Sequence, residues 1–248
     1  MQYHGFFTRD YLVLENVRME RETSILEIGV GTGSLVESLK RKYSKYHGVD
    51  ISCEMITALK SVYAGRPEVV FTCADACDQN FSLGEKFEVI VSMDTFEHVH
   101  IPSIFLSFIK KHLSTKGIVL LVYPNESEER HHGVSWVRSK NELIRMIDNN
   151  NLKVTKLFEV NKSIWHKAIK IFLWDIPKKL FIREDVKPQT FEETKAFNIF
   201  ISKRKIVKIL KLYSLVITRI ATLFPLYIYG DVGEDIENKN LCICMEHK

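Results

Sequence analysis

Short apolar runs alternate with segments of helical spacing along most of the chain. The runs expected to form strands are residues 25–28, 46–50, 69–73, 87–92, 117–123 and 152–160. The segments between them that are expected to form helices are residues 34–42, 53–63, 102–113 and 139–150. In the third of these segments Phe105, Phe108, Ile109 and His112 fall on one stripe, as in an amphipathic helix. Strands that alternate with helices of this length predict a doubly wound α/β fold around a parallel sheet.

The last apolar run, residues 241–245, predicts a seventh strand. Because it is short and terminal, we expect it to insert antiparallel beside the strand at residues 117–123. The expected sheet therefore has seven strands, of which the last is antiparallel.

A long segment between the sixth and seventh strands exceeds what such a sheet requires. No glycine occurs between Gly133 and Gly230, which favours long helices, and residues 206–223 place apolar side chains at helical spacing. We expect a core of residues 1–160 and 239–248 and a helical insertion of residues 161–238. The insertion would serve as a lid, an acceptor-binding element or an interface.

Positive charge is concentrated in one part of the chain. Residues 153–220 carry 16 Lys/Arg and 6 Asp/Glu, although the whole chain has a net charge of only +4. Such asymmetry predicts a different partner for this segment than for the rest. A lid packed on the core, a homodimer through residues 161–238, and a basic amphipathic helix lying on a membrane surface all stay open.

The cysteines and the amino-terminal residues indicate a cytoplasmic protein, with peripheral membrane attachment as the alternative. Residues 1–10 lack the apolar run of a signal peptide. The five cysteines are odd in number and lack zinc-ribbon spacing, so we expect reduced buried thiols and no metal site.

A glycine-rich turn follows the first expected strand. Gly29, Gly31 and Gly33 stand at every second position, where the backbone can adopt positive φ and approach a ligand closely. We expect free N–H groups of this turn to point at a cofactor. The spacing departs from the G-x-G-x-x-G dinucleotide fingerprint, because Ser34 stands where the third glycine belongs.

Polar residues follow the next strands. Asp50 ends the second strand, 19 residues after Gly31, where a carboxylate can accept both ribose hydroxyls of a nucleoside. Ala74-Asp75-Ala76 follows the third strand, Ser92-Met93-Asp94-Thr95-Phe96-Glu97-His98-Val99 follows the fourth, and Tyr123-Pro124-Asn125 closes the fifth. Ligands of doubly wound folds bind at these carboxyl ends.

Taken together, Glu27-x-Gly29-x-Gly31-x-Gly33, Asp50, Asp75 and the residue 92–99 block resemble class I S-adenosylmethionine (SAM) dependent methyltransferases. The resemblance covers residues 20–160 and the terminal strand, and the Glu97-His98-Val99 block resembles the small-molecule enzymes of ubiquinone biosynthesis. It implies a Rossmann-like core and SAM as cofactor, with S-adenosylhomocysteine (SAH) as product. The cofactor contacts it implies are Glu27, Gly29, Gly31, Gly33, Asp50, Ile51, Asp75, Ala76, Met93, Asp94 and His98. Glu27 and Asp94 could instead be a helix cap or surface acid, and Ile51 and Cys77 could simply pack.

The implied reaction is an in-line transfer of a methyl group from a sulfonium to a nucleophile, which requires alignment and exclusion of water. A histidine suits the general base. The candidate bases are His98, His131 and His132, although His98 could instead hold its loop and the other two could be surface residues. The candidate substrate contacts are Tyr3, Tyr123, Asn125, His131 and Trp165.

The predicted activity is O- or N-methylation of a small molecule that is anionic (phosphorylated or carboxylated) or linked to a lipid or sugar. One alternative is an RNA methyltransferase, but Ser92-Met93-Asp94-Thr95 departs from the N/D-P-P-Y/F motif of base-methylating enzymes, and no DNA partner is expected. The other alternative is a relative that binds SAM without turnover.

Overall fold

The computed structural model describes residues 10–20, 22–39, 42–125, 137, 139–162, 171, 227–237 and 239–248. The chain divides into two compact units. One comprises Arg9–Val160 and Tyr229–Lys248 and contains most of the sheet described below; the other comprises Met1–Thr8 and Asn161–Ile228. The sheet unit therefore resumes at residue 229, ten residues earlier than the expected core boundary at 239. The expected helix at 206–223 lies outside the described residues.

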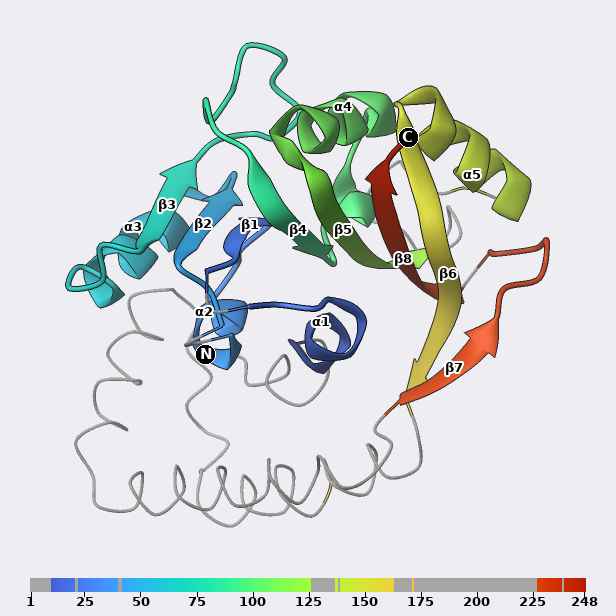
Figure 1. The fold of residues 1–248 in the computed structure, drawn as a ribbon, viewed down its shortest axis with the longest axis horizontal. Helices are drawn as coiled ribbons and strands as arrows, with labels where there is room; N and C mark the ends of the chain where they lie inside the picture. The colour runs from blue at the N-terminus through green and yellow to red at the C-terminus, as the bar shows by residue number, and fades with distance from the viewer. Residues whose placement is uncertain are drawn as a thin grey trace, which may run out of the picture. The chain divides into compact units, whose positions relative to one another are not determined.

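The sheet has the strand order β3-β2-β1-β4-β5-β8-β6-β7, which runs across Figure 1. Its strands are β1 (Ser24–Ile28), β2 (Lys45–Asp50), β3 (Val69–Cys73), β4 (Phe87–Met93), β5 (Leu113–Asn125), β6 (Leu152–Lys162), β7 (Tyr227–Asp231) and β8 (Lys239–His247). Strands β1 to β5 are parallel, and β8 lies antiparallel between β5 and β6. The doubly wound sheet with an antiparallel last strand is confirmed.

The strand count differs from the expected seven, because β7 is an additional strand among the described residues. It lies in the segment of residues 161–238 that we expected to form a helical insertion. Its Tyr-Ile-Tyr run consists of residues that favour strands, a local signal that the helical spacing upstream obscured.

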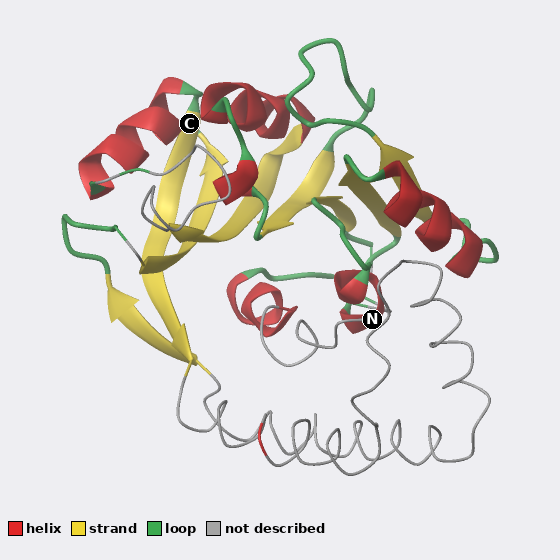
Figure 2. Ribbon diagram, turned by 180° about the vertical axis from the view of Figure 1, so that it is seen from behind, coloured by secondary structure: helices red, strands yellow, loops and turns green. Residues whose placement is uncertain are grey.

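Helices cover both faces of the sheet. They are α1 (Asp10–Asn16), α2 (Ser34–Ser38), α3 (Cys53–Val62), α4 (Pro102–His112) and α5 (Lys140–Asn149), with a 3₁₀ turn at η1 (Phe96–His98). Figure 1 shows α4 and α5 on one side of the sheet and α1 and α2 on the other, and Figure 2 shows the same layers from behind. Helix α1 was not expected, and α2 ends before the expected residue 42.

The helix starts follow from capping. Ser139 accepts the Glu142 N–H at 3.2 Å and caps α5 as expected, and Pro102 occupies the first turn of α4. The apolar stripe of α4 packs on β4 and β5 in a core that also contains Phe96 and Tyr123. Each buried Phe stabilises this layer by about 2–3 kcal/mol. This core fixes the positions of the strands, and the loops that form the site follow the carboxyl ends of the strands.

The expectation of reduced cysteines is wrong for one pair. Cys53 and Cys73 form a disulfide with a Cα–Cα distance of 5.0 Å, whereas Cys77, Cys242 and Cys244 are free. The spacing of 20 residues gave no sign of this pairing, because only the β2–α3–β3 crossover brings the two residues together.

No helix in the described ranges is long and apolar enough to cross a bilayer. Within those same ranges no group of His, Cys, Asp and Glu is arranged to hold a metal ion.

Candidate cofactor site at the carboxyl ends of the strands

The glycine turn between β1 and α2 has the backbone conformation that its sequence predicts. Gly29, Gly31 and Gly33 have φ angles of 81°, 49° and 72°, in the left-handed region that favours glycine. A Cβ at Gly29 would overlap the side chain of Thr95, and one at Gly33 would lie 2.7 Å from Leu59. A Cβ at Gly31 would meet nothing within 4 Å. Gly31 is therefore the glycine of this turn that borders open space.

Four amides of the turn are already hydrogen bonded within the protein. The N–H groups of Gly29 and Val30 donate to the Val49 carbonyl, and the Gly33 N–H donates to the Val30 carbonyl. The Gly31 N–H donates to Asp50. The expectation of free N–H groups is wrong for these four positions. The turn is held rigid by β2 and does not present these donors to an anion.

Asp50 at the end of β2 is the polar centre of the site. One carboxylate oxygen accepts the Gly31 N–H at 2.8 Å, and the other accepts the Ser52 N–H at 2.9 Å. Each oxygen of an ionised carboxylate has about two acceptor positions, so each keeps room for a further donor such as a hydroxyl. The side chain is half-buried, and the neighbouring Ile51 is 71% exposed. An exposed apolar side chain thus follows directly after a carboxylate that is fixed at two points.

The loop after β3 places a second acid at this edge. The Asp75 carboxylate is exposed and accepts the Cys77 N–H at 2.8 Å, which fixes a tight turn. Ala76 is buried and also lines a cavity of about 260 Å³ between this loop and α4. The Ala74 N–H donates to the Asp50 carbonyl at 3.0 Å, so the loops after β2 and β3 are joined.

The loop after β4 is tied to the end of β1. The hydroxyls of Ser92 and Thr95 lie 3.0 and 3.4 Å from the Ile28 carbonyl. Asp94 adopts a φ of 48° and donates its N–H to Val122 at 2.8 Å. Left-handed backbone at a non-glycine residue such as Asp94 costs about 1–2 kcal/mol. The preceding residue, Met93, is half-buried. His98 is exposed, with its Nε2 3.9 Å from the Glu97 carboxylate.

Glu27 lies inside the sheet unit at 4% exposure and accepts the Tyr46 hydroxyl. Its burial on β1 excludes the surface-acid alternative.

The two expected substrate contacts on β5 are buried. Asn125 is 1% exposed; its amide donates to the Val137 and Ile236 carbonyls at 2.7 and 2.8 Å, and its oxygen accepts the Val137 N–H at 3.2 Å. These contacts occupy both donors and the oxygen of Asn125. Tyr123 is fully buried, and among the described residues its hydroxyl has no hydrogen-bond partner. Burial is the main reason that the pKa of Tyr123 is raised, with nearby Glu97 as a second cause.

Four candidate residues, Tyr3, His131, His132 and Trp165, lie outside the described residues. The sequence analysis missed two residues of this region. Ser52 binds the Asp50 carboxylate, and Thr95 packs against Gly29. Ser52 had a signal, since a serine just before a helix is a preferred N-cap, and here its hydroxyl accepts the Met55 N–H at 3.3 Å. Thr95 had none, because its partner lies 66 positions away.

A family model described as a methyltransferase domain matches residues 8–156, more than half of the chain. The chain belongs to this family of methyltransferases. The resemblance to class I SAM-dependent methyltransferases is confirmed.

Two curated relatives are similar to part of this chain. This chain is 33% identical over 121 residues to a malonyl-[acyl-carrier protein] O-methyltransferase of Bacillus cereus, and the match covers 48% of this chain and 44% of that protein. It is 23% identical over 181 residues to a ubiquinone biosynthesis O-methyltransferase of Pelagibacter ubique, covering 66% of this chain and 75% of that protein. The chain thus spans less than half the length of the Bacillus relative.

Among solved structures, a phosphoethanolamine N-methyltransferase 2 of Haemonchus contortus in complex with SAM has a similar fold. The TM-score is 0.54 at 17% identity, and the match covers 98% of this methyltransferase and 52% of that chain. This likeness supports the Rossmann-like assignment of the fold.

Proposed function

We propose that this methyltransferase transfers the methyl group of SAM to an oxygen of a small anionic molecule. The observation that carries the proposal is the pair of hydrogen bonds that fix Asp50 between Gly31 and Ser52. A carboxylate held from both sides, with acceptor capacity left on each oxygen, suits the two vicinal hydroxyls of a ribose.

The occupied amides distinguish between nucleotide cofactors. A pyrophosphate requires free N–H donors at the glycine turn. Here the N–H groups of Gly29, Val30, Gly31 and Gly33 are already bonded within the protein. A cofactor with a ribose and no phosphate fits such a turn better than a dinucleotide does.

The remaining contacts would surround the adenosine. The exposed Ile51 offers an apolar surface to the base, and Asp75 offers an acceptor to its amino group. The open space at Gly31 allows the backbone to approach the amino-acid part of the cofactor. Bound SAM would supply a methyl group activated by its sulfonium charge, so the protein mainly has to align the acceptor and exclude water.

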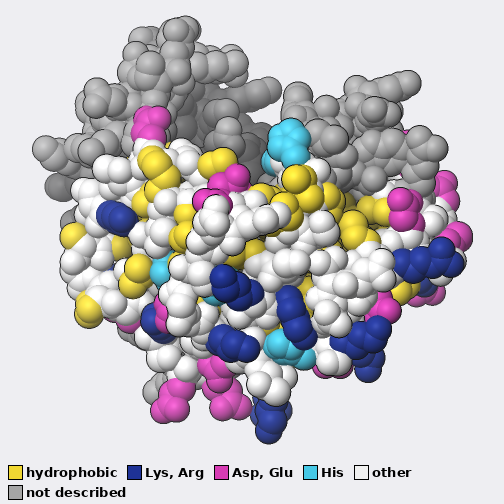
Figure 3. Space-filling model, turned by 90° about the horizontal axis from the view of Figure 1, so that it is seen from above, with side chains coloured by type: hydrophobic (Ala, Val, Ile, Leu, Met, Phe, Trp, Pro, Cys, Tyr) yellow, Lys and Arg dark blue, Asp and Glu magenta, His cyan; other side chains and the backbone are white. Residues whose placement is uncertain are grey.

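The class of acceptor is supported by the relatives and by the charge of the chain. Both curated relatives are named O-methyltransferases, one of a malonyl group on a carrier protein and one of ubiquinone biosynthesis. The net positive charge of residues 153–220 favours a carboxylated or phosphorylated acceptor. On the face seen in Figure 3, basic and acidic side chains of the described residues are interspersed, which gives RNA no continuous basic track there.

His98 is the general base that we propose among the described residues. Its imidazole is exposed at the end of η1, four residues after Asp94 in the sequence. Removal of a base of this kind typically lowers the rate by 10²–10⁴-fold. We expect His98→Gln to lower kcat by about 100-fold.

The decisive test is calorimetric binding of SAH. We expect binding by the wild type, at least about 100-fold weaker binding by Asp50→Ala, which corresponds to about 2.7 kcal/mol, and no response to NAD. Asp231→Ala is the matched control, since this exposed aspartate lies on β7 at the opposite edge of the sheet from β3. Equal affinities of wild type and Asp50→Ala would contradict the proposal.

The acceptor is tested separately. Wild type loaded with SAM is expected to release SAH with small carboxylated or phosphorylated compounds and not with RNA. Turnover of RNA that falls steeply with salt would favour the RNA alternative, and SAH binding without turnover on any acceptor would favour the non-catalytic one.

A further inference from the structure

We propose that the Cys53–Cys73 disulfide is a reversible redox switch that sets the affinity of the adenosine side of the site for SAM. The inference rests on the proposed function, because Asp50 and Asp75 are its adenosine contacts.

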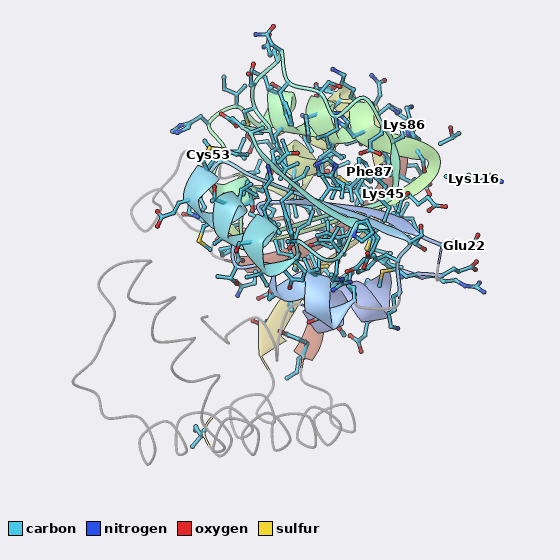
Figure 4. The ribbon with its side chains drawn as sticks, turned by 90° about the vertical axis from the view of Figure 1, so that its left-hand side faces the viewer. Glu22, Lys45, Cys53, Lys86, Phe87 and Lys116 are labelled. Carbon is cyan, nitrogen blue, oxygen red and sulfur yellow. A yellow bond between two sulfur atoms is a disulfide. The ribbon has the colours of Figure 1, made fainter. Side chains whose placement is uncertain are left out.

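The disulfide joins the two loops that carry these acids. Cys53 is the first residue of α3, three positions after Asp50, and Cys73 is the last residue of β3, two positions before Asp75. Cys73 is also the register partner of Asp50 across the β2–β3 pair, and its Sγ lies 3.7 Å from the Ile51 carbonyl oxygen. In Figure 4 Cys53 lies towards the left of the view, and Glu22, which precedes β1, lies at the right.

The bridge fixes the groups that hold Asp50. Ser52, whose N–H binds the Asp50 carboxylate, is the direct neighbour of Cys53. Ala74, whose N–H binds the Asp50 carbonyl, is the direct neighbour of Cys73. The disulfide therefore links the two segments whose N–H groups bind the carboxylate and the carbonyl of Asp50. A site ordered before binding avoids the cost of ordering it on binding, so the oxidised form is expected to bind more tightly.

The disulfide is placed where a reductant can reach it. Cys53 is exposed and Cys73 is half-buried. A thiolate of a small external thiol attacks one sulfur, the S–S bond breaks, and the released sulfur leaves as a thiolate that takes up a proton. A second external thiol resolves the mixed disulfide, so that two external thiols become one external disulfide and the protein gains two thiols.

The neighbouring thiol is a poor internal competitor for this exchange. Cys77 is free and half-buried, and burial together with the Asp75 charge raises its pKa to about 11. Because the thiolate is the attacking species, Cys77 stays unreactive near neutral pH. The state of the bridge is then set by external thiols and oxidants, as in a redox sensor. In reducing compartments, accessible disulfides are typically of this transient kind.

The test compares SAH binding by the full chain in two redox states. The protein is oxidised with diamide or reduced with a phosphine, peptide mass mapping without reductant verifies the bridge, and calorimetry gives the Kd for SAH. We expect the Kd of wild type to rise roughly fivefold on reduction, the size expected for ordering one loop segment. The double variant Cys53→Ser/Cys73→Ser should bind like reduced wild type in both conditions. Cys77→Ser should keep the oxidised-to-reduced ratio of wild type.

The other outcomes distinguish failure of the switch from failure of the proposed function. Equal or tighter binding after reduction, or no bridge in oxidised protein, overturns the switch and leaves the proposed function intact. No binding of SAH in either state overturns the proposed function and the switch with it. The wild-type comparison does not depend on whether the double variant folds.

Discussion

Asp50 and Asn125 each stand at the end of a parallel strand, yet the fold uses them in opposite ways. Asp50 is half-buried, and among the described residues each of its carboxylate oxygens has one hydrogen-bond partner, which leaves room for another donor. Asn125 is 1% exposed, and both its amide hydrogens and its oxygen are bonded to the backbone at Val137 and Ile236. A polar residue at a strand end is therefore a candidate ligand-binding residue only if some of its donors or acceptors are not already bonded within the protein.

The same contrast separates the glycines of the turn. Gly29 is required by the packing of Thr95 within the protein, whereas Gly31 borders open space. We therefore expect substitutions in these two regions to separate loss of folding from loss of binding.

The largest effect is expected for Gly29→Ala. A φ of 81° and the overlap of the new Cβ with Thr95 combine backbone strain with overpacking, for a loss of about 4 kcal/mol in the free energy of unfolding. Urea unfolding measures it. Gly65→Ala is the control, because a Cβ there meets nothing within 4 Å and φ is not positive, so a change below about 0.5 kcal/mol is expected.

Asn125→Ala should lower the free energy of unfolding by about 3 kcal/mol, since it leaves two carbonyls and one N–H buried without partners. Urea unfolding again measures the change, with the exposed Asn80→Ala as the control. If Asn125→Ala were as stable as wild type and instead impaired turnover, Asn125 would belong to the acceptor site after all.

Gly31→Ala should behave differently from Gly29→Ala. Its φ of 49° costs an alanine about 1 kcal/mol of folding stability, but no protein atom is overlapped. A methyl group in the open space should weaken SAH binding by about tenfold or more, as measured by calorimetry on the folded variant. An affinity for SAH equal to that of wild type would place the cofactor away from this turn.

The smallest effect concerns the acid sensitivity of the sheet unit. His112 is buried; its Nδ1 donates to the Phe108 carbonyl at 2.8 Å, its Nε2 accepts the Leu83 N–H at 3.0 Å, and burial lowers its pKa below the usual 6.5. The unfolded chain then binds the proton first as pH falls. The stabilisation is full above about pH 6.5 and is lost progressively as the pH falls below that value.

Unfolding in urea at pH 5, 6, 7 and 8 measures this slope. His112→Gln should be less stable overall but flatter between pH 7 and 5. His47, whose pKa is also lowered by burial, contributes with the same sign, so some slope should persist in the single variant. An unchanged slope in His112→Gln would contradict the assignment to His112.

Much of the fold could be predicted because its determinants are local. The periodicity of residues 69–73 gave β3 with its correct bounds, and Ser139 marked the start of α5. The antiparallel position of β8 followed from its terminal place in the chain. The Cys53–Cys73 pair and the hydrogen bond from the Gly31 amide to Asp50 depend on partners distant in sequence, so local pattern carries no information about them.

The sequence by itself determined the order of strands and helices, the glycine turn and the acid 19 residues beyond Gly31, because periodicity and φ preference act over a few residues. Only the tertiary structure decided which polar groups remain available. In the folded chain the Asn125 amide donates to the Val137 and Ile236 carbonyls, the Gly31 amide donates to Asp50, and Cys53 lies beside Cys73. Whether a hydrogen bond or a disulfide forms depends on the distance between atoms, and that distance exists only once the chain has folded.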